Sequence, residues 1–228
     1  MAGTLNLSLS GEELGDYVAR QLSLFFPDGY ECGPCLRFHT AEALSRLGHC
    51  LANSVWFSER TGPSAVRPTF NHLFSDHYAT YLYYLANTIA INGGDRKVAD
   101  KIFCLNKALH ALDIYYEVKM PEIFTLSHSV GTVIGRADIG EYLYIYQGCT
   151  IGGTHNLTYP RIGRGVVMYG QSQVIGNSII GDNCIIGAGV SIINQVIPSN
   201  TIVALVDGIP SLRDNNSDVV GKYFNLRK

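Results

Sequence analysis

Residues 162–193, with the sequence IGRGVVMYGQSQVIGNSIIGDNCIIGAGVSII, place an aliphatic side chain at every sixth position. An α-helix repeats every 3.6 residues and a simple strand every two, so a strict period of six requires another geometry. The spacing predicts a triangular prism in which three short strands form one coil of about 18 residues and the aliphatic side chains stack along the axis. The six axial positions in this stretch are Ile162, Met168, Val174, Ile180, Ile186 and Ile192.

The period continues toward the N-terminus with a shift in phase. Ile151 and Ile162 are eleven positions apart, so the intervening segment 152–160, GGTHNLTYP, must leave the prism as an external loop. Loops that interrupt a repeat tend to line its binding face. Glycine often follows the axial residue, and we expect it to permit a tight corner or a positive φ there. The earlier axial positions are predicted to be Val133, Ile139, Ile145 and Ile151.

The charged residues of this 228-residue chain are distributed unevenly. Residues 128–206 hold 13 of its 24 glycines but only six Asp, Glu, Lys or Arg side chains. The net charge of −2 and the lack of a basic stripe argue against nucleic-acid binding, and an aromatic content of 11% argues against disorder. Gly, Asn, Ser and Pro interrupt the uncharged runs, and the first residues lack the features of a signal peptide. We therefore expect a soluble, cytoplasmic protein that does not bind membranes.

The segment before the repeat, positions 1–112, shows helical periodicity instead. Ser10 and Glu13 have the spacing of a capping box, and apolar residues follow at helical intervals as far as Phe25. Three further helices are predicted, one starting at Thr40, one over 71–92 and one over 96–112.

Cys32 and Cys35 form a C-x-x-C motif near the start of the chain. Redox chemistry would need a βαβ setting that the flanking sequence does not offer. Zinc binding is conceivable because His39 and His49 are nearby, but no second C-x-x-C or paired histidine motif follows. We favour a reduced structural turn and predict no metal site.

Four further segments carry a resemblance to a known family. They are Asp113-Ile114, LSHSVGTVIG (126–135), YQGCTIGGT (146–154) and IGAG (186–189). Together with the helical N-terminal region, they resemble the serine O-acetyltransferases, which are hexapeptide-repeat acyltransferases. The resemblance covers about residues 96–206 and implies a left-handed parallel β-helix, acetyl-CoA as co-substrate, no metal, and a homotrimer or a dimer of trimers.

The predicted organisation is therefore of the α+β class. It comprises a helical domain over residues 1–112, a left-handed β-helix over 113–206 with the external loop at 152–160, and a C-terminal tail over 207–228.

The resemblance also implies the catalytic residues. His128 corresponds to the family's catalytic base, Asp113 to its carboxylate partner, and the backbone N–H of Gly153 to an oxyanion donor. An alcohol cannot attack a thioester near neutral pH unless a base removes its proton, and neutral imidazole suits that task. The hydroxyl would attack the acetyl carbonyl directly, and His128 would then protonate the departing thiolate.

The coenzyme A site is expected in the groove between adjacent subunits. Thr154, Gly170 and Ala188 match family positions in that groove, and Gly170 and Ala188 are separated by one predicted coil. For each of these residues, plain repeat geometry is an equal alternative.

The candidate acceptor-binding residues depart from the family pattern. Ser127 stands where the family usually has Asp, and Thr158-Tyr159 stands where it has Arg-His. Because those charged groups would pair with the two ends of serine, either another residue such as Arg161 binds the carboxylate or the acceptor is not free serine. Asp100 resembles an acidic residue that helps to hold serine, with a solvated helix charge as the alternative. His155 in the loop could approach the acceptor or the cofactor, or remain solvated.

Three functions stay open at this point. The favoured one is an acetyl-CoA-dependent O-acetyltransferase for serine or a similar small hydroxy amino acid. The alternatives are an O-acetyltransferase for a sugar or nucleotide-linked sugar, and a non-catalytic solenoid scaffold.

Overall fold

The computed structural model describes residues 5–55, 58–60 and 66–225. The chain divides into two compact units. The first extends to Glu117, and the second begins at Val118 and also includes residues 53–55. The division after Glu117 lies close to the domain boundary that the sequence predicted after Leu112.

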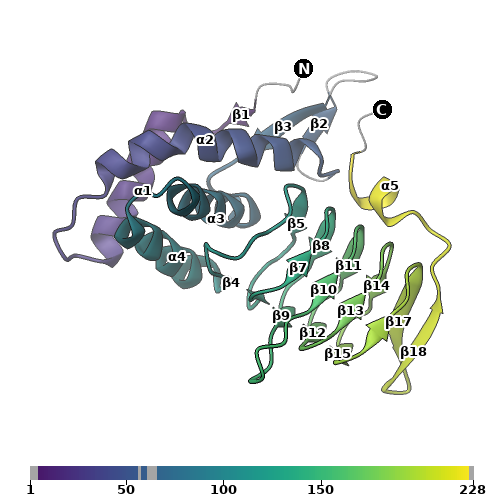
Figure 1. Ribbon diagram of the computed structural model, residues 1–228. Helices are drawn as coiled ribbons and strands as arrows, with labels where there is room; N and C mark the ends of the chain where they lie inside the picture. The colour runs from purple at the N-terminus through teal and green to yellow at the C-terminus, as the bar shows by residue number, and fades with distance from the viewer. Residues whose placement is uncertain (1–4, 56–57, 61–65, 226–228) are drawn as a thin grey trace. The chain divides into compact units, whose positions relative to one another are not determined.

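The first unit consists of helices and a small sheet (Figure 1). Helix α3 contacts both α2 and α4, and nearly all of its side chains are buried. The short strands form a sheet in the order β1-β3-β2. The elements are β1 (Asn6–Leu7), α1 (Gly11–Phe25), α2 (Gly33–Ala52), β2 (Ser58–Arg60), β3 (Val66–Phe70), α3 (Ser75–Ile91), α4 (Arg96–His110) and β4 (Asp113–Ile114).

The predicted helices are present, with corrections at their ends. The capping box is confirmed, because Glu13 N–H donates to Ser10 Oγ and Ser10 N–H donates to Glu13 Oε2. The start of the second helix at Thr40 is wrong, since α2 begins at Gly33 and the C-x-x-C motif therefore opens a helix rather than a turn. Phe25, expected on the apolar face of α1, is 44% exposed because the helix ends there.

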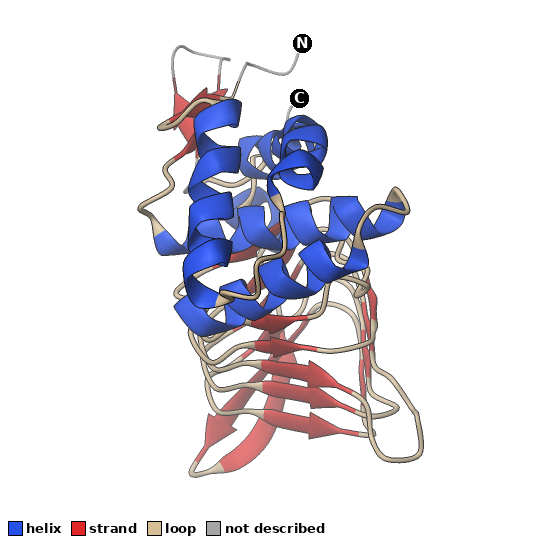
Figure 2. Cartoon of the chain, turned by 90° about the vertical axis from the view of Figure 1, so that its left-hand side faces the viewer, coloured by secondary structure: helices blue, strands red, loops and turns tan. Residues whose placement is uncertain are grey.

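The second unit is a parallel β-solenoid whose strands stack coil upon coil (Figure 2). Its strands are β5 (Phe124–Leu126), β6 (Val133–Ile134), β7 (Asp138–Ile139), β8 (Leu143–Ile145), β9 (Thr150–Gly152), β10 (Arg161–Ile162), β11 (Val166–Met168), β12 (Gln173–Ile175), β13 (Ile179–Ile180), β14 (Ile185–Ile186), β15 (Ser191–Ile193), β16 (Val196–Ile197), β17 (Thr201–Val206) and β18 (Ile209–Asp214). We name its three sides by their strand order: face 1 is β5-β8-β11-β14-β17, face 2 is β6-β9-β12-β15 and face 3 is β7-β10-β13-β16.

The chain turns between faces at three stacked rows of corners, which we name edges. Edge 1–2 comprises residues 127–132, 146–149, 169–172 and 187–190. Edge 2–3 comprises 135–137, 153–160, 176–178 and 194–195. Edge 3–1 comprises 140–142, 163–165, 181–184 and 198–200. Apart from Arg161, which begins β10, the candidate functional residues of the solenoid lie on these edges.

The predicted axial stack is largely confirmed. Ile162 pairs with Ile180 and Val174 pairs with Ile192, each in the next coil, and all four side chains are buried. Val133 is a wrong prediction, because it is 39% exposed and Ile134 takes the axial place opposite Ile151. The coil from Ile134 to Ile151 is one position shorter than the coil from Ile162 to Ile180, so the strict period misplaces the axial residue by one.

The glycines that follow axial residues serve close approach rather than a left-handed backbone. A Cβ on Gly163 would lie 2.7 Å from the carbonyl carbon of Gly181, and one on Gly181 would lie 2.4 Å from the backbone nitrogen of Ser199. Neither Gly163 nor Gly181 has a positive φ, so that part of the expectation is wrong. Such short contacts with backbone exclude any side chain, which explains glycine at these corners.

The predicted C-terminal tail has a defined structure as far as residue 225. Strand β18 pairs antiparallel with β17, and helix α5 (Val219–Tyr223) follows. Tyr223 of this helix packs with Tyr144 and Val167 in one buried hydrophobic cluster on the outer side of face 1. The C-terminal segment therefore covers part of one side of the solenoid.

None of the helices in the described ranges is both long and apolar enough to span a bilayer.

Candidate functional site

His128 lies at an irregular corner of the solenoid. The first corner on edge 1–2 contains six residues, whereas each of the three later corners on this edge contains four. Each corner has a left-handed residue three positions before an axial residue, for example Gly131, Gly148 and Gln171. His128 is an additional left-handed residue, with φ +52°, within the enlarged corner.

The hydrogen bonds of this corner hold His128 at the surface. Ser127 N–H donates to the Ile145 carbonyl at 2.9 Å, and Val130 N–H donates to the His128 carbonyl at 2.7 Å. Ser127 and Ser129 are buried on either side of His128, which is exposed. A left-handed backbone costs a non-glycine residue on the order of 1 kcal/mol, and such conformations concentrate at functional sites. The geometry thus presents an imidazole to solvent at the expense of local strain.

The second irregularity is the segment expected to form an external loop. Ile151 pairs with Val174, so this coil is five positions longer than the regular coil that follows it from Val174 to Ile192. The loop is closed at its neck, where the hydroxyls of Thr154 and Thr158 are 2.7 Å apart and Thr154 N–H donates to the Thr158 carbonyl. His155 is exposed beyond this neck. The extra residues therefore lie on edge 2–3.

Gly153 lies against the ring of Tyr159 at the base of this loop. A Cβ on Gly153 would lie 2.8 Å from two ring carbons of Tyr159, so only glycine fits here. Among the residues that the structure describes, no acceptor receives a hydrogen bond from Gly153 N–H, and Gly153 is exposed. Its amide can therefore donate to an external oxyanion.

The three predicted coenzyme A residues lie on two different edges. Gly170 and Ala188 belong to edge 1–2, the edge of His128, and Met168 pairing with Ile186 places them one coil apart. A Cβ on Gly170 would lie 2.8 Å from Gln147 Nε2, so the glycine also allows close corner packing. Thr154 instead belongs to edge 2–3.

Two predicted acidic residues lie in the first unit. Asp113 Oδ2 is 2.7 Å from Lys107 Nζ, and this hydrogen bond raises the pKa of the lysine. Asp100 accepts a hydrogen bond of 2.7 Å from the hydroxyl of buried Tyr116. Burial, reinforced by hydrogen bonds to Tyr115 and Asp100, raises the pKa of Tyr116, so this phenol stays a donor. Asp100 and Asp113 thus each have a polar contact within the first unit.

Arg161 lies beside a carboxylate. It begins β10 and pairs in register with Asp138 of β7, and both side chains are exposed. Arg136, which the sequence reasoning did not single out, lies one coil below the loop and contacts Tyr159. The sequence does offer one signal for Arg136, because residues 128–206 contain only three arginines.

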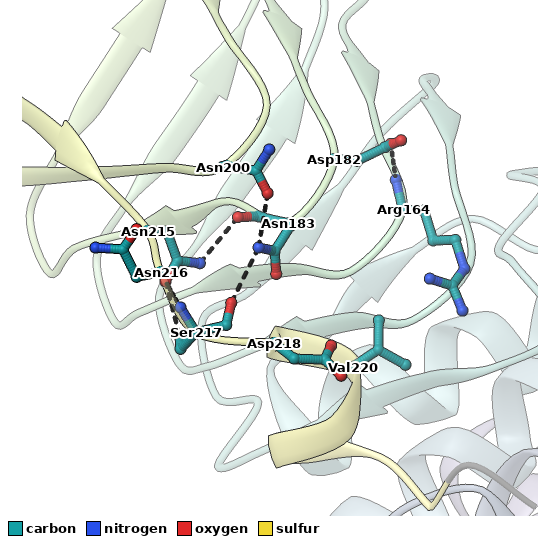
Figure 3. Close-up of a pocket in the computed structure, with 9 residues that line it drawn as sticks. All are labelled: Arg164, Asp182, Asn183, Asn200, Asn215, Asn216, Ser217, Asp218 and Val220. Atoms are coloured by element: carbon teal, nitrogen blue, oxygen red, sulfur yellow. Dashed lines mark hydrogen bonds between the residues drawn. The ribbon is translucent and has the colours of Figure 1, made fainter.

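A cavity of about 380 Å³ lies along edge 3–1 (Figure 3). Asn183 Nδ2 donates to Asn200 Oδ1 and to the Ser217 carbonyl, and Asn215 Nδ2 donates to the Asn183 carbonyl. These amide hydrogen bonds hold the C-terminal segment against the corners of edge 3–1. None of the predicted site residues lines this cavity.

The cysteines show no sign of redox activation or metal binding within the described residues. Cys32 and Cys35 are free thiols, and burial raises the pKa of both, which is opposite to what a reactive thiolate requires. No group of three or more His, Cys, Asp or Glu side chains in the described ranges is arranged to hold a metal ion.

Curated relatives of the chain are serine acetyltransferases. The chain is 34% identical over 108 residues to the enzyme of Synechococcus elongatus, covering 46% of this chain and 44% of the relative. It is 34% identical over 128 residues to that of Staphylococcus epidermidis, covering 54% and 58%. The chain thus spans about half the length of the curated relatives it matches. No protein-family profile matches it.

Solved serine acetyltransferase structures share the fold over most of the chain. The structure from Neisseria gonorrhoeae superposes with a TM-score of 0.69 and 20% identity, covering 95% of this chain and 84% of that one. The structure from Brucella abortus strain S19 gives a TM-score of 0.67 and 22% identity, covering 90% and 84%. The chain is therefore similar in sequence to serine acetyltransferases over about half of its length, and it has their fold.

Proposed function

We propose that this protein is an acetyl-CoA-dependent O-acetyltransferase that acts on serine or a similar small hydroxy amino acid. The observation that carries the proposal is His128, held in a strained, exposed corner of a solenoid that resembles serine acetyltransferases. Related structures were solved with coenzyme A, from Brucella abortus, and with serine, from Neisseria gonorrhoeae. These ligands fit the small-molecule co-substrate and acceptor proposed for this chain.

His128 would act as the general base. Its imidazole accepts the hydroxyl proton of the acceptor as the oxygen attacks the acetyl carbonyl, and returns a proton to the coenzyme A thiolate as the C–S bond breaks. Gly153 N–H would donate to the oxyanion of the tetrahedral intermediate. Asp113 would orient the imidazole through its other nitrogen and stabilise the imidazolium. No enzyme-bound acyl group is needed in this scheme.

The division of the candidate residues between two edges favours a site shared by two subunits. Edge 1–2 carries His128, Gly170 and Ala188, whereas edge 2–3 carries Gly153 and Thr154. Face 2 separates these edges by strands of two or three residues. Three residues of extended chain span roughly 10 Å, which a histidine side chain does not bridge. A closed threefold ring would bring edge 1–2 of each subunit against edge 2–3 of the next, giving three equal sites. We propose such a homotrimer, which could pair further into a dimer of trimers.

Release of free thiol from acetyl-CoA tests the proposal. We expect thiol release with L-serine or L-homoserine as acceptor, and an acetylated product that mass spectrometry identifies. Transfer to sugars or nucleotide-linked sugars without transfer to either amino acid would contradict the proposed acceptor. No transfer to any hydroxyl acceptor would instead favour a scaffold role.

A further inference from the structure

The loop that should receive the acceptor carries little charge of its own. Residues 153–160 contain no Asp, Glu, Lys or Arg, and His155 is their only titratable side chain apart from Tyr159. An acceptor with a carboxylate needs a cation nearby, because a charge bound without a partner loses most of its hydration without compensation. The cation must therefore come from outside the loop.

Arg136 is the arginine that the fold places under this loop. Residues on either side of Arg136 are bonded to residues near both ends of the loop: Gly135 N–H donates to the Ile151 carbonyl at 2.7 Å, and Asp138 N–H donates to the Pro160 carbonyl at 3.0 Å. These two bonds fix the backbone of Arg136 directly below the loop. Because they belong to the coil-to-coil ladder, the position is set by the repeat itself.

The side chain of Arg136 extends toward the base of the loop. Its Nη1 is 3.4 Å from the hydroxyl of Tyr159, and its guanidinium carbon lies 5.4 Å from the centre of the Tyr159 ring. The same ring lies against Gly153, the proposed oxyanion donor. Arg136, Tyr159 and Gly153 thus form one continuous cluster on edge 2–3.

The other two arginines within residues 128–206 lie outside this cluster. Arg161 begins β10 and pairs in register with Asp138, and among the described residues no hydrogen bond or cation–π contact joins its side chain to Tyr159. Arg164 is on edge 3–1, with its guanidinium 4.6 Å from the centre of the Tyr142 ring. Within the described part of the second unit, no carboxylate lies within 4.0 Å of Arg136. Its charge is therefore available to a ligand.

We infer that Arg136 binds the carboxylate of the acceptor and that Tyr159 positions its guanidinium. This inference rests on the proposed acetyltransferase activity and narrows its acceptor to a hydroxy compound with a free carboxylate. A planar guanidinium suits this role because it offers two parallel N–H donors to the two carboxylate oxygens. Arg136, which contacts Tyr159 at the base of the loop, is thus the specificity-determining cation in place of Arg161, the example named from the sequence.

The test compares acceptors that differ only in charge. Thiol release is measured with L-serine and with L-serinamide, in which a neutral amide replaces the carboxylate, for the unmodified protein and for Arg136→Gln. Loss of one charged contact is expected to raise KM for L-serine by about 10- to 100-fold, with a much smaller change in kcat. KM for L-serinamide should change by less than about twofold, because the amide lacks the charge that Arg136 recognises.

Two further variants control for structural effects. Arg136→Lys keeps the charge but not the fork of donors, so it should raise KM for L-serine less than Arg136→Gln does. Arg164→Gln removes an arginine that also lies over a tyrosine ring, and it should leave the kinetics with both acceptors unchanged.

Two results would overturn the inference. If Arg136→Gln leaves KM for L-serine unchanged, or raises KM equally for L-serine and L-serinamide, Arg136 does not recognise the carboxylate while the proposed activity stands. If the unmodified protein acetylates only sugars, both the proposed acceptor and the role of Arg136 are wrong.

Discussion

The coils from Arg161 to Ile193 repeat with one constant spacing, whereas the coils before them carry two insertions. Between β10 and β15, register partners keep one constant separation, as Ile162 with Ile180 and Val174 with Ile192 show. The earlier coils contain the enlarged corner with His128 and the loop at residues 153–160. The regular coils supply stability through stacked aliphatic side chains, and the insertions supply exposed polar groups. Chemistry is therefore expected where the solenoid departs from its own repeat.

The largest effect is expected from the enlarged corner. His128→Ala should lower kcat for acetyl transfer by about 10²- to 10⁴-fold, because the acceptor proton then has no base to accept it. The thermal midpoint should change little, since the side chain is exposed and alanine keeps the same left-handed backbone. Steady-state thiol release and thermal unfolding measured on one preparation check both statements.

A matched control for this variant is His72→Ala. His72 lies in the first unit, where its ring hydrogen-bonds Ser8 Oγ, and its removal should leave kcat unchanged. Equal loss of activity in the two variants would show that the effect at His128 is not specific.

A smaller effect, on stability alone, is expected in the regular coils. Gly181→Ala places a Cβ 2.4 Å from the Ser199 backbone nitrogen and should destabilise the solenoid by about 3 kcal/mol. Gly152→Ala is the control, because its Cβ would meet its nearest neighbour, Ile175 Cδ1, at an ordinary 3.9 Å. Urea denaturation followed by circular dichroism measures the difference. Equal stability of the two variants would contradict the view that glycine at residue 181 is required by backbone contact.

The sequence predicted the regular part of the fold better than its exceptions. The period of six placed Ile162, Val174 and Ile186 on the axis, because a stacked core repeats with the coil. It misplaced Val133, because the coil from Ile134 to Ile151 is one position short, and a corner can lose a residue without leaving a composition signal. The start of α2 at Gly33 was also missed, since packing extends the helix beyond the apolar pattern that begins near Thr40.

The candidate site was only partly visible in the sequence. His128 and Gly153 were proposed from the resemblance, and the loop from the break in period. Arg136 was missed because its significance depends on coil stacking, which brings it to Tyr159 in the next coil. The separation of the candidate residues onto two edges likewise required the register of the strands.

The most direct test of the account asks whether the two insertions act together across a subunit boundary. Deleting residues 154–158 should restore the spacing of six between Ile151 and Ile162 and remove the loop without disturbing the axis. This deletion variant and His128→Ala should each be inactive alone. When they are unfolded together in equal amounts and refolded, random trimers should regain about a quarter of the unmodified activity, because one site in four then combines two intact edges. Failure to regain activity in mixed oligomers would show that each site lies within one chain and would contradict the account.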